Sequence, residues 1–120
     1  MSAPIVFLVD NGSLRPQATL ILRSLADALA ERTVLSVEAV SLLHSHKIAV
    51  DKLNGVSATI VKRRLRECLA AGQREFIFLP LFLGPSLAVT DYLPKVVDEL
   101  SGEYPELKVR IASVLAGDNL

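Results

Sequence analysis

Short apolar runs alternate along the chain with segments that repeat apolar residues every three or four positions. The runs are rich in β-branched residues and show little polar alternation, which is typical of strands buried on both faces. They span residues 4–10, 34–43, 75–83 and 107–115. The helical spacing falls in residues 16–32, 57–71 and 88–101. This order predicts an α/β fold, in which a four-stranded parallel sheet carries helices on both faces.

The predicted elements have recognisable ends. Pro16 suits the first turn of the first helix, and Pro94 either distorts the third helix or marks its start. Ser57 is expected to cap the second helix and Gly72 to end it. Pro80 indicates that regular pairing of the third strand ends there. The apolar stripes contain Leu22, Leu25, Ala26 and Leu29 in the first helix, Val61, Leu65, Cys68 and Leu69 in the second, and Val89, Leu93, Val96, Val97 and Leu100 in the third.

Composition narrows the class of protein. A chain of 120 residues is expected to form one domain over residues 1–120, and its 51% apolar content predicts apolar surface left for a second copy in a homo-oligomer. The 13 basic and 13 acidic residues cancel, which disfavours nucleic acid and anionic membranes as partners. Cys68, the only cysteine, is expected in the core. No signal-peptide pattern is present and the longest apolar run, Phe76–Leu83, is too short to span a bilayer, so we expect a cytoplasmic protein.

Three loops are expected to meet at the carboxyl edge of the sheet, where α/β proteins place their ligands. They comprise residues 10–16, 44–54 and 84–91. Gly12 and Ser13 precede a helix, whose free backbone N–H groups and dipole favour an anion. Arg15 and Lys47 would add positive charge. Ordinary turn chemistry would select the same glycine and serine, so both interpretations stay open.

The two histidines, His44 and His46, directly follow the second predicted strand. In an extended segment, residues two apart point to the same side, so both imidazoles could ligate one metal ion or move a proton, supported by Asp10 or Asp91. The alternative is a solvated polar loop. Asp10 is also consistent with an Asx-type turn and Asp91 with a structural role. A solvated helix face is expected for the basic run Lys62, Arg63, Arg64 and Arg66.

Two motifs resemble a known family. The turn Asn11-Gly12-Ser13-Leu14-Arg15-Pro16 resembles the His-Gly-Ser-Arg-x-Pro turn of the CbiX/SirB-type class II tetrapyrrole chelatases. The segment Pro80-Leu81-Phe82-Leu83-Gly84 through Asp91 and Pro94 is similar to their Pro-Leu-Phe-Leu segment with its Gly-x-His-x-x-x-Asp-x-Pro continuation. The resemblance implies a chelatase-like, flavodoxin-like three-layer sandwich that pairs as a homodimer. It also implies insertion of cobalt, iron or nickel into a reduced tetrapyrrole such as sirohydrochlorin, as in cobalamin and siroheme biosynthesis.

Both motif histidines of that family are replaced in this chain. Asn11 stands at the first position and Leu87, with Ser86 beside it, at the second. Metal insertion removes two pyrrole protons and needs a base and a metal ligand, whereas a carboxamide is not basic. We therefore expect weakened or altered chelatase activity; the alternative is a non-catalytic tetrapyrrole or metal carrier or sensor. The expected catalytic residues are Asn11, His44 and Asp91, the metal ligands His44 and His46, and the ligand-binding residues Asp10, Gly12, Ser13, Arg15, Lys47, Gly84 and Ser86.

Two other classes of similar size do not fit the residues. A phosphoacceptor receiver domain needs an acidic pair after the first strand, where Asp10 is followed by Asn11. A flavodoxin needs a hydroxyl-rich phosphate loop, whereas residues 10–16 contain one serine, so FMN is not expected as a cofactor. A structural subunit that pairs with a catalytic partner stays open.

Overall fold

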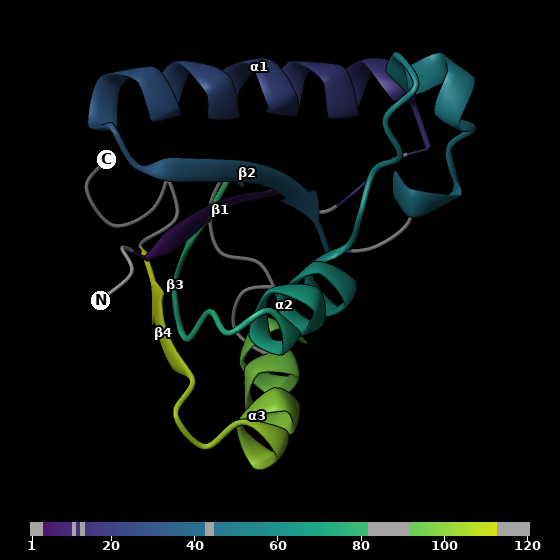
Figure 1. The fold of residues 1–120 in the computed structure, drawn as a ribbon. Coiled ribbons are helices and arrows are strands. Elements are labelled where there is room, and N and C mark those ends of the chain that lie inside the picture. Colours follow the sequence, from purple (N-terminus) through teal and green to yellow (C-terminus); the bar gives the residue numbers. More distant parts are fainter. Residues whose placement is uncertain (1–3, 11, 13, 43–44, 82–91, 113–120) are drawn as a thin grey trace.

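Four parallel strands form one sheet in the order β2-β1-β3-β4. The computed structural model describes residues 4–10, 12, 14–42, 45–81 and 92–112 (Figure 1). The strands are β1 (Ile5–Asp10), β2 (Ser36–Ser41), β3 (Glu75–Pro80) and β4 (Lys108–Ile111). The predicted four-stranded parallel sheet is therefore confirmed, although β2 and β4 are shorter than their apolar runs.

Helices cover both faces of the sheet, as predicted. The helix α1 (Pro16–Thr33) lies on one face, and α2 (Val61–Ala70) and α3 (Leu93–Glu103) lie on the other (Figure 1). Alternate residues of β1 enter different layers: Phe7 packs with α2 and α3, whereas Leu8 packs with α1. Because both faces of β1 are covered, its run from Ile5 to Val9 is apolar throughout and buried.

Three phenylalanines form the centre of the core between the sheet and α2 and α3. Phe7 stacks on Phe76 and Phe78 with ring centroids 5.6 and 5.5 Å apart, and all three side chains are almost completely buried. Cys68 is buried in the same cluster, as predicted. Burial raises the pKa of its thiol, so it remains a neutral apolar group.

The predicted apolar stripe of α1 is wrong at one position. Leu22 and Ala26 are buried and Leu29 packs against them, but Leu25 is 42% exposed. Thr19 takes the inward position on this face of the helix. Helical spacing marks every apolar residue on one side of α1, but a helix that packs on a sheet buries only the narrower stripe that contacts the sheet. Leu25 lies outside that stripe.

The second helix begins later than predicted. Ser57 is exposed and does not cap it, because α2 begins at Val61 with Ile60 in the cap position and no side-chain cap. The residues just before α2 pair instead with the end of β2: the Ser41 N–H donates to the Thr59 carbonyl at 3.3 Å, and Ser41 and Ile60 form a parallel bridge. Pairing with the sheet thus prevails over a local capping signal.

All three proline predictions hold, and α1 begins at Pro16. Regular pairing of β3 ends at Pro80, opposite Val9 of β1. Pro94 lies in the first turn of α3, where it marks the start of the helix at Leu93 rather than distorting its interior. The predicted helical residues 88–91 lie outside the described part of the chain.

Candidate functional site at the carboxyl edge of the sheet

Asp10 and Ser41 form the polar end of two neighbouring strands. They are register partners at the ends of β1 and β2, and the Ser41 hydroxyl donates to Asp10 Oδ1 at 2.5 Å. The Leu42 N–H also donates to the Asp10 carbonyl at 2.9 Å. Two of the predicted loops, those after β1 and β2, therefore start side by side at the carboxyl edge. The sequence interpretation missed Ser41, although it is the polar residue in register with Asp10.

The Asp10 carboxyl group is partly withdrawn from water. Burial raises its pKa above the ordinary value, and hydrogen bonds from the Ser41 hydroxyl and the Gly12 backbone N–H oppose that shift without cancelling it. The bond from Gly12, two residues on, is the Asx-type turn considered from the sequence. Gly12 has a φ of 100°, a conformation that favours glycine. The turn and a site role are compatible, because each carboxylate oxygen can accept more than one hydrogen bond.

The helix α1 starts directly after this turn. Arg15 is its exposed N-cap residue, without a side-chain cap, and the first turn contains no acidic residue. The partial positive charge on the free N–H groups of that turn is therefore not offset by a carboxylate within the turn. This arrangement is compatible with the predicted anion seat. Asn11 and Ser13 lie outside the described residues.

The segment after β2 is folded rather than a solvated loop. Two short 3-10 turns, η1 (Ser45–Lys47) and η2 (Val50–Leu53), bury Ile48 and Leu53 against Ala58. The extended conformation assumed for the histidine pair is therefore wrong from residue 45 onward. His44 lies outside the described residues, so the predicted His44 and His46 metal pair stays a prediction.

Two polar groups of η1 lack partners in the described part of the chain. They are the buried Oγ of Ser45 and Nδ1 of His46. Ser45 is 1% exposed, whereas Lys47 in the same turn is exposed. A buried polar atom without a partner is normally satisfied by water or a ligand. The sequence interpretation assigned no role to Ser45.

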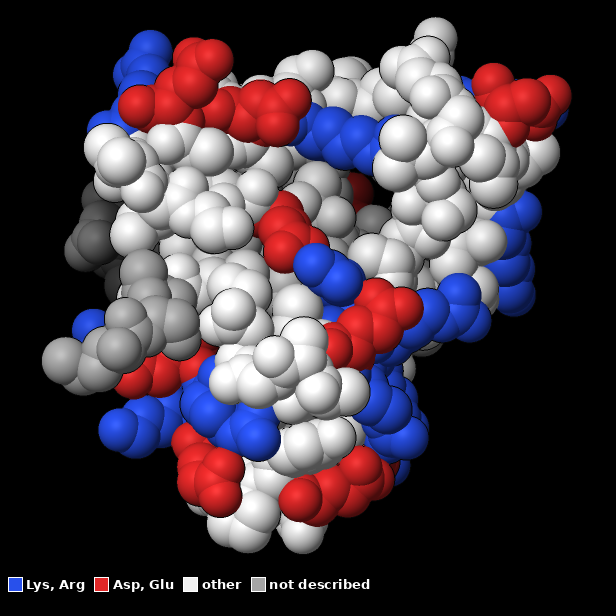
Figure 2. All heavy atoms as spheres, in the orientation of Figure 1, with Lys and Arg blue, Asp and Glu red and all other residues white. Residues whose placement is uncertain are grey.

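Arg23 holds this segment against α1. Its guanidinium donates to the carbonyls of Leu53 at 3.0 Å and Val56 at 2.7 Å. The sequence offered no local signal for this contact, because the partners are 30 and 33 residues away. Beside Arg23 is a cavity of about 280 Å³ between α1, β2 and residues 56–59, which opens as a hollow beneath α1 on the face in Figure 2. Three of its lining hydroxyl residues, Thr19, Ser41 and Ser45, are buried.

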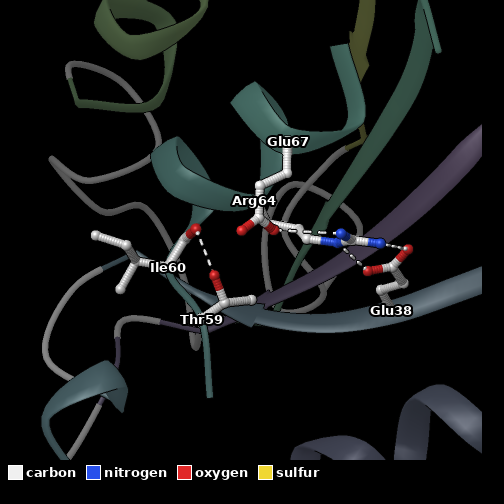
Figure 3. A network of polar contacts seen from close by, with 5 residues as sticks. All are labelled: Glu38, Thr59, Ile60, Arg64 and Glu67. Carbon is white, nitrogen blue, oxygen red and sulfur yellow. Dashed lines mark hydrogen bonds and ion pairs between the residues drawn. The ribbon is translucent and has the colours of Figure 1, made fainter. Parts of the chain in front are cut away.

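The basic run on α2 is only partly a solvated face. Lys62, Arg63 and Arg66 are exposed, as predicted, but Arg64 is half-buried and reaches β2. Its Nε and Nη2 atoms donate to the two carboxylate oxygens of Glu38 at 2.7 and 3.1 Å (Figure 3). This ion pair raises the pKa of Arg64 above its ordinary value. Elsewhere on the face in Figure 2, positive and negative side chains are interspersed, in line with the zero net charge.

The third predicted loop spans residues 84–91. Gly84, Ser86, Leu87 and Asp91 lie outside the described residues, so their site roles stay predictions. Within residues 4–81 and 92–112, apart from the gaps given above, no group of three or more His, Cys, Asp or Glu side chains could hold a metal ion. None of the described helices has the length and apolar content to cross a bilayer.

Comparisons with known proteins agree with this architecture. The sequence matches the CbiX family over residues 5–120. Among solved structures, the fold is similar to that of a cobalamin (vitamin B12) biosynthesis CbiX protein from Marinobacter aquaeolei VT8, with a TM-score of 0.68 and 15% sequence identity over 95% of this chain and 83% of that chain. At this identity, the likeness concerns the fold. No match was found among curated protein sequences.

Proposed function

Since the chain belongs to the CbiX family, we propose that it binds a sirohydrochlorin-like tetrapyrrole at the carboxyl edge of its sheet and inserts a divalent metal ion into it. The metal is a substrate of the reaction, and cobalt and iron are the first candidates, with nickel as a third. Cobalamin biosynthesis is the process to which the family and its structural neighbour point.

The observation that carries the proposal is the Asp10 carboxyl group. Metal insertion must remove two protons from pyrrole nitrogens, and Asn11 cannot accept them because a carboxamide is not basic. Asp10 directly precedes Asn11 in the sequence. Its Oδ1 accepts a hydrogen bond from the Ser41 hydroxyl at 2.5 Å, and burial raises its pKa. A carboxylate with a raised pKa is a stronger base than an ordinary aspartate. In this proposal Asp10 accepts one pyrrole proton, releases it to water and then accepts the second, and Ser41 is a positioning residue.

The remaining predicted residues have binding roles in this proposal. The peripheral carboxylates of the tetrapyrrole would lie at the start of α1, beside Gly12 and Ser13, where the N–H groups of the first helical turn are free of a carboxylate of that turn. Arg15 and Lys47, both exposed, would add positive charge. Asn11 would hydrogen-bond the macrocycle, and His44, His46 or Asp91 would bring the metal ion to the ring face. These assignments rest on the family resemblance and on the shared carboxyl edge.

The non-catalytic carrier is the second candidate. It is favoured by Asn11 and Leu87, which stand where the family motifs have histidine. A protein that lost its strongest metal ligands could still bind the macrocycle through the carboxylate seat, because that seat needs only backbone N–H groups and cations.

A spectroscopic titration separates the two candidates. Sirohydrochlorin is titrated with the purified chain, and Co²⁺ is then added while the absorbance spectrum is recorded against a protein-free reaction. Saturable binding followed by the spectrum of the metallated product, formed faster than in the protein-free reaction, supports the enzyme. Saturable binding without faster metallation supports the carrier. Absence of binding contradicts both candidates.

A further inference from the structure

The cavity beside α1 reaches the candidate site through one residue. It lies between α1, β2 and residues 56–59, and Ser41 is part of its wall. Ser41 is also the residue whose hydroxyl donates to Asp10 Oδ1 at 2.5 Å. The cavity opens to solvent as a hollow beneath α1 (Figure 2). Ser41 therefore stands between the Asp10 carboxyl group and a space that communicates with solvent.

Strand geometry places Asp10 on the same side of the sheet as the cavity. Side chains two residues apart in a strand point to the same face. Val37 and Ala39 of β2 pack in the layer of α1, so Ser41 faces α1 as well. Leu8 of β1 packs in that layer too, so Asp10 also faces α1. The Asp10 carboxyl group thus lies on the sheet face that the cavity adjoins.

The wall of the cavity is suited to hold water. With a volume of about 280 Å³, the cavity has room for several water molecules. A cavity lined by apolar groups alone stays dry, whereas hydroxyl and charged groups supply the partners that each water molecule needs. The polar residues of this wall are Thr19, Arg23, Asp27, Glu38, Ser41, Ser45, Ser57 and Thr59. We therefore expect hydrogen-bonded water to connect Ser41 with bulk solvent.

The proposed reaction requires a way out for protons. Asp10 accepts two pyrrole protons in turn, so it must give up the first before it can take the second. A tetrapyrrole bound over the carboxyl edge separates Asp10 from the water above that edge, as ligands that close a site do. The cavity reaches Asp10 from beneath α1, on a side that a macrocycle at the edge does not cover.

We propose that Ser41 and the water in this cavity form the proton exit of Asp10. The proposal rests on the proposed function and adds the route by which the base is regenerated. Protonated Asp10 donates its proton to Ser41 Oγ while the Ser41 hydroxyl donates its own proton to a cavity water molecule. The products are the Asp10 carboxylate and a hydronium ion, which passes its charge to bulk water. The Ser41 hydroxyl then turns back to Asp10, and one proton has left for each that Asp10 accepted.

Filling the cavity without touching Asp10 tests this route. Ala39→Leu adds a branched apolar group to the cavity wall, two residues from Ser41 on the same face of β2. Ala39→Ser is the control at that position, because it leaves the cavity open. Ala28→Leu is the matched control elsewhere, because Ala28 is exposed on α1 and lies outside the cavity wall. Circular dichroism checks folding, and Ala39→Met replaces Ala39→Leu if the leucine variant does not fold.

Two measurements are made on each protein. Nuclear Overhauser transfer from water to the methyl protons of Thr19 and Thr59 reports water in the cavity, and it needs no substrate. Cobalt insertion into sirohydrochlorin, measured in H₂O and in D₂O, gives kcat, KM and the solvent isotope effect.

The wild type and both controls are expected to show water in the cavity and the same kinetics. Ala39→Leu is expected to lose the water signal and to lower kcat about tenfold at unchanged KM. Its solvent isotope effect is expected to rise, because proton exit becomes the slow step. A purely structural disturbance would not raise the isotope effect.

The possible failures are distinguishable. A dry cavity in the wild type overturns the proton exit whether or not the protein is an enzyme. So does an Ala39→Leu variant with wild-type kcat, or one whose kcat falls without a larger isotope effect. A wild type that inserts no cobalt refutes the proposed enzyme function, and the proton exit with it.

Discussion

Removal of the Arg64 guanidinium tests how α2 is held to the sheet. Arg64→Met keeps most of the aliphatic stem and removes the two hydrogen bonds to Glu38 and the contact with Glu67 at 3.3 Å. The Glu38 side chain, on β2, is then left 28% exposed without its cation. Loss of stability is expected because this carboxylate is largely desolvated and has lost its partner.

The magnitude lies between those of exposed and buried ion pairs. Exposed pairs contribute about 0.2–1 kcal/mol, and removal of one partner from a buried pair costs about 3–5 kcal/mol. The side chains of Arg64 and Glu38 are 34% and 28% exposed, so solvent screens part of the interaction. We expect Arg64→Met to lower the free energy of unfolding by about 2 kcal/mol, which corresponds to a Tm lower by about 8 °C for a chain of 120 residues.

A double-mutant cycle measures the pair itself. Urea unfolding of the wild type, Arg64→Met, Glu38→Gln and the double variant is expected to give a coupling energy of about 1–1.5 kcal/mol. The matched control is Arg66 with Glu103, which form a single contact at 3.3 Å with both side chains about half exposed. Its coupling is expected to stay below about 0.5 kcal/mol. Equal coupling in both cycles would refute the reasoning from burial and bidentate geometry.

Three further changes test other parts of the structure. Val34→Gly is expected to stabilise the fold by about 1 kcal/mol in thermal melts, because Val34 ends α1 at a φ of 59°, where a β-branched residue is strained; an unchanged or lower Tm contradicts this. Arg23→Met is expected to speed hydrogen exchange of residues 45–60 about tenfold while β1 stays protected, and uniform exchange would show that Arg23 does not anchor this segment. The raised pKa of Asp10 stabilises the protein below the ordinary value of 3.8, and this contribution is lost as pH rises through the folded-state pKa. Urea unfolding across that range is therefore expected to show wild-type stability falling relative to Asp10→Asn, and parallel curves would contradict the burial of the carboxyl.

The sheet and its layers could be predicted from the sequence because burial on both faces leaves a strong pattern. The β1 run from Ile5 to Val9 contains no polar residue, which is typical of a parallel strand covered by helices on both sides. The proline positions were equally informative, since the missing N–H of Pro80 and Pro94 limits where each can stand.

The errors share a different physical cause. Ser57 has the character of a helix cap, but Thr59 and Ile60 pair with Ser41 at the end of β2, and that pairing cannot be inferred from local propensity. The segment after β2 was expected to be a polar loop, yet it buries Ile48 and Leu53, and Arg23, 30 residues before Leu53, donates to its carbonyls. Long-range contacts of this kind leave no mark in the local spacing of residues.

The candidate site, too, could be predicted from the sequence only in part. Asp10 was recognised at the strand end, but its partner Ser41 becomes evident only when the register of β1 and β2 is known. Because both motif histidines of the family are replaced, His44 and His46 were predicted to supply the missing imidazoles. The buried carboxyl of Asp10 depends on its surroundings, which no motif encodes.

The central claim is that Asp10 replaces the missing imidazole as the proton acceptor, and the initial rate of cobalt insertion into sirohydrochlorin tests it most directly. The rate is compared among the wild type, Asp10→Asn and Asp98→Asn, an exposed carboxylate on α3 that serves as the control. The account predicts that all three bind the tetrapyrrole equally and that only Asp10→Asn loses insertion, by about 100-fold or more. If Asp10→Asn inserts cobalt as fast as the wild type, Asp10 is not the base.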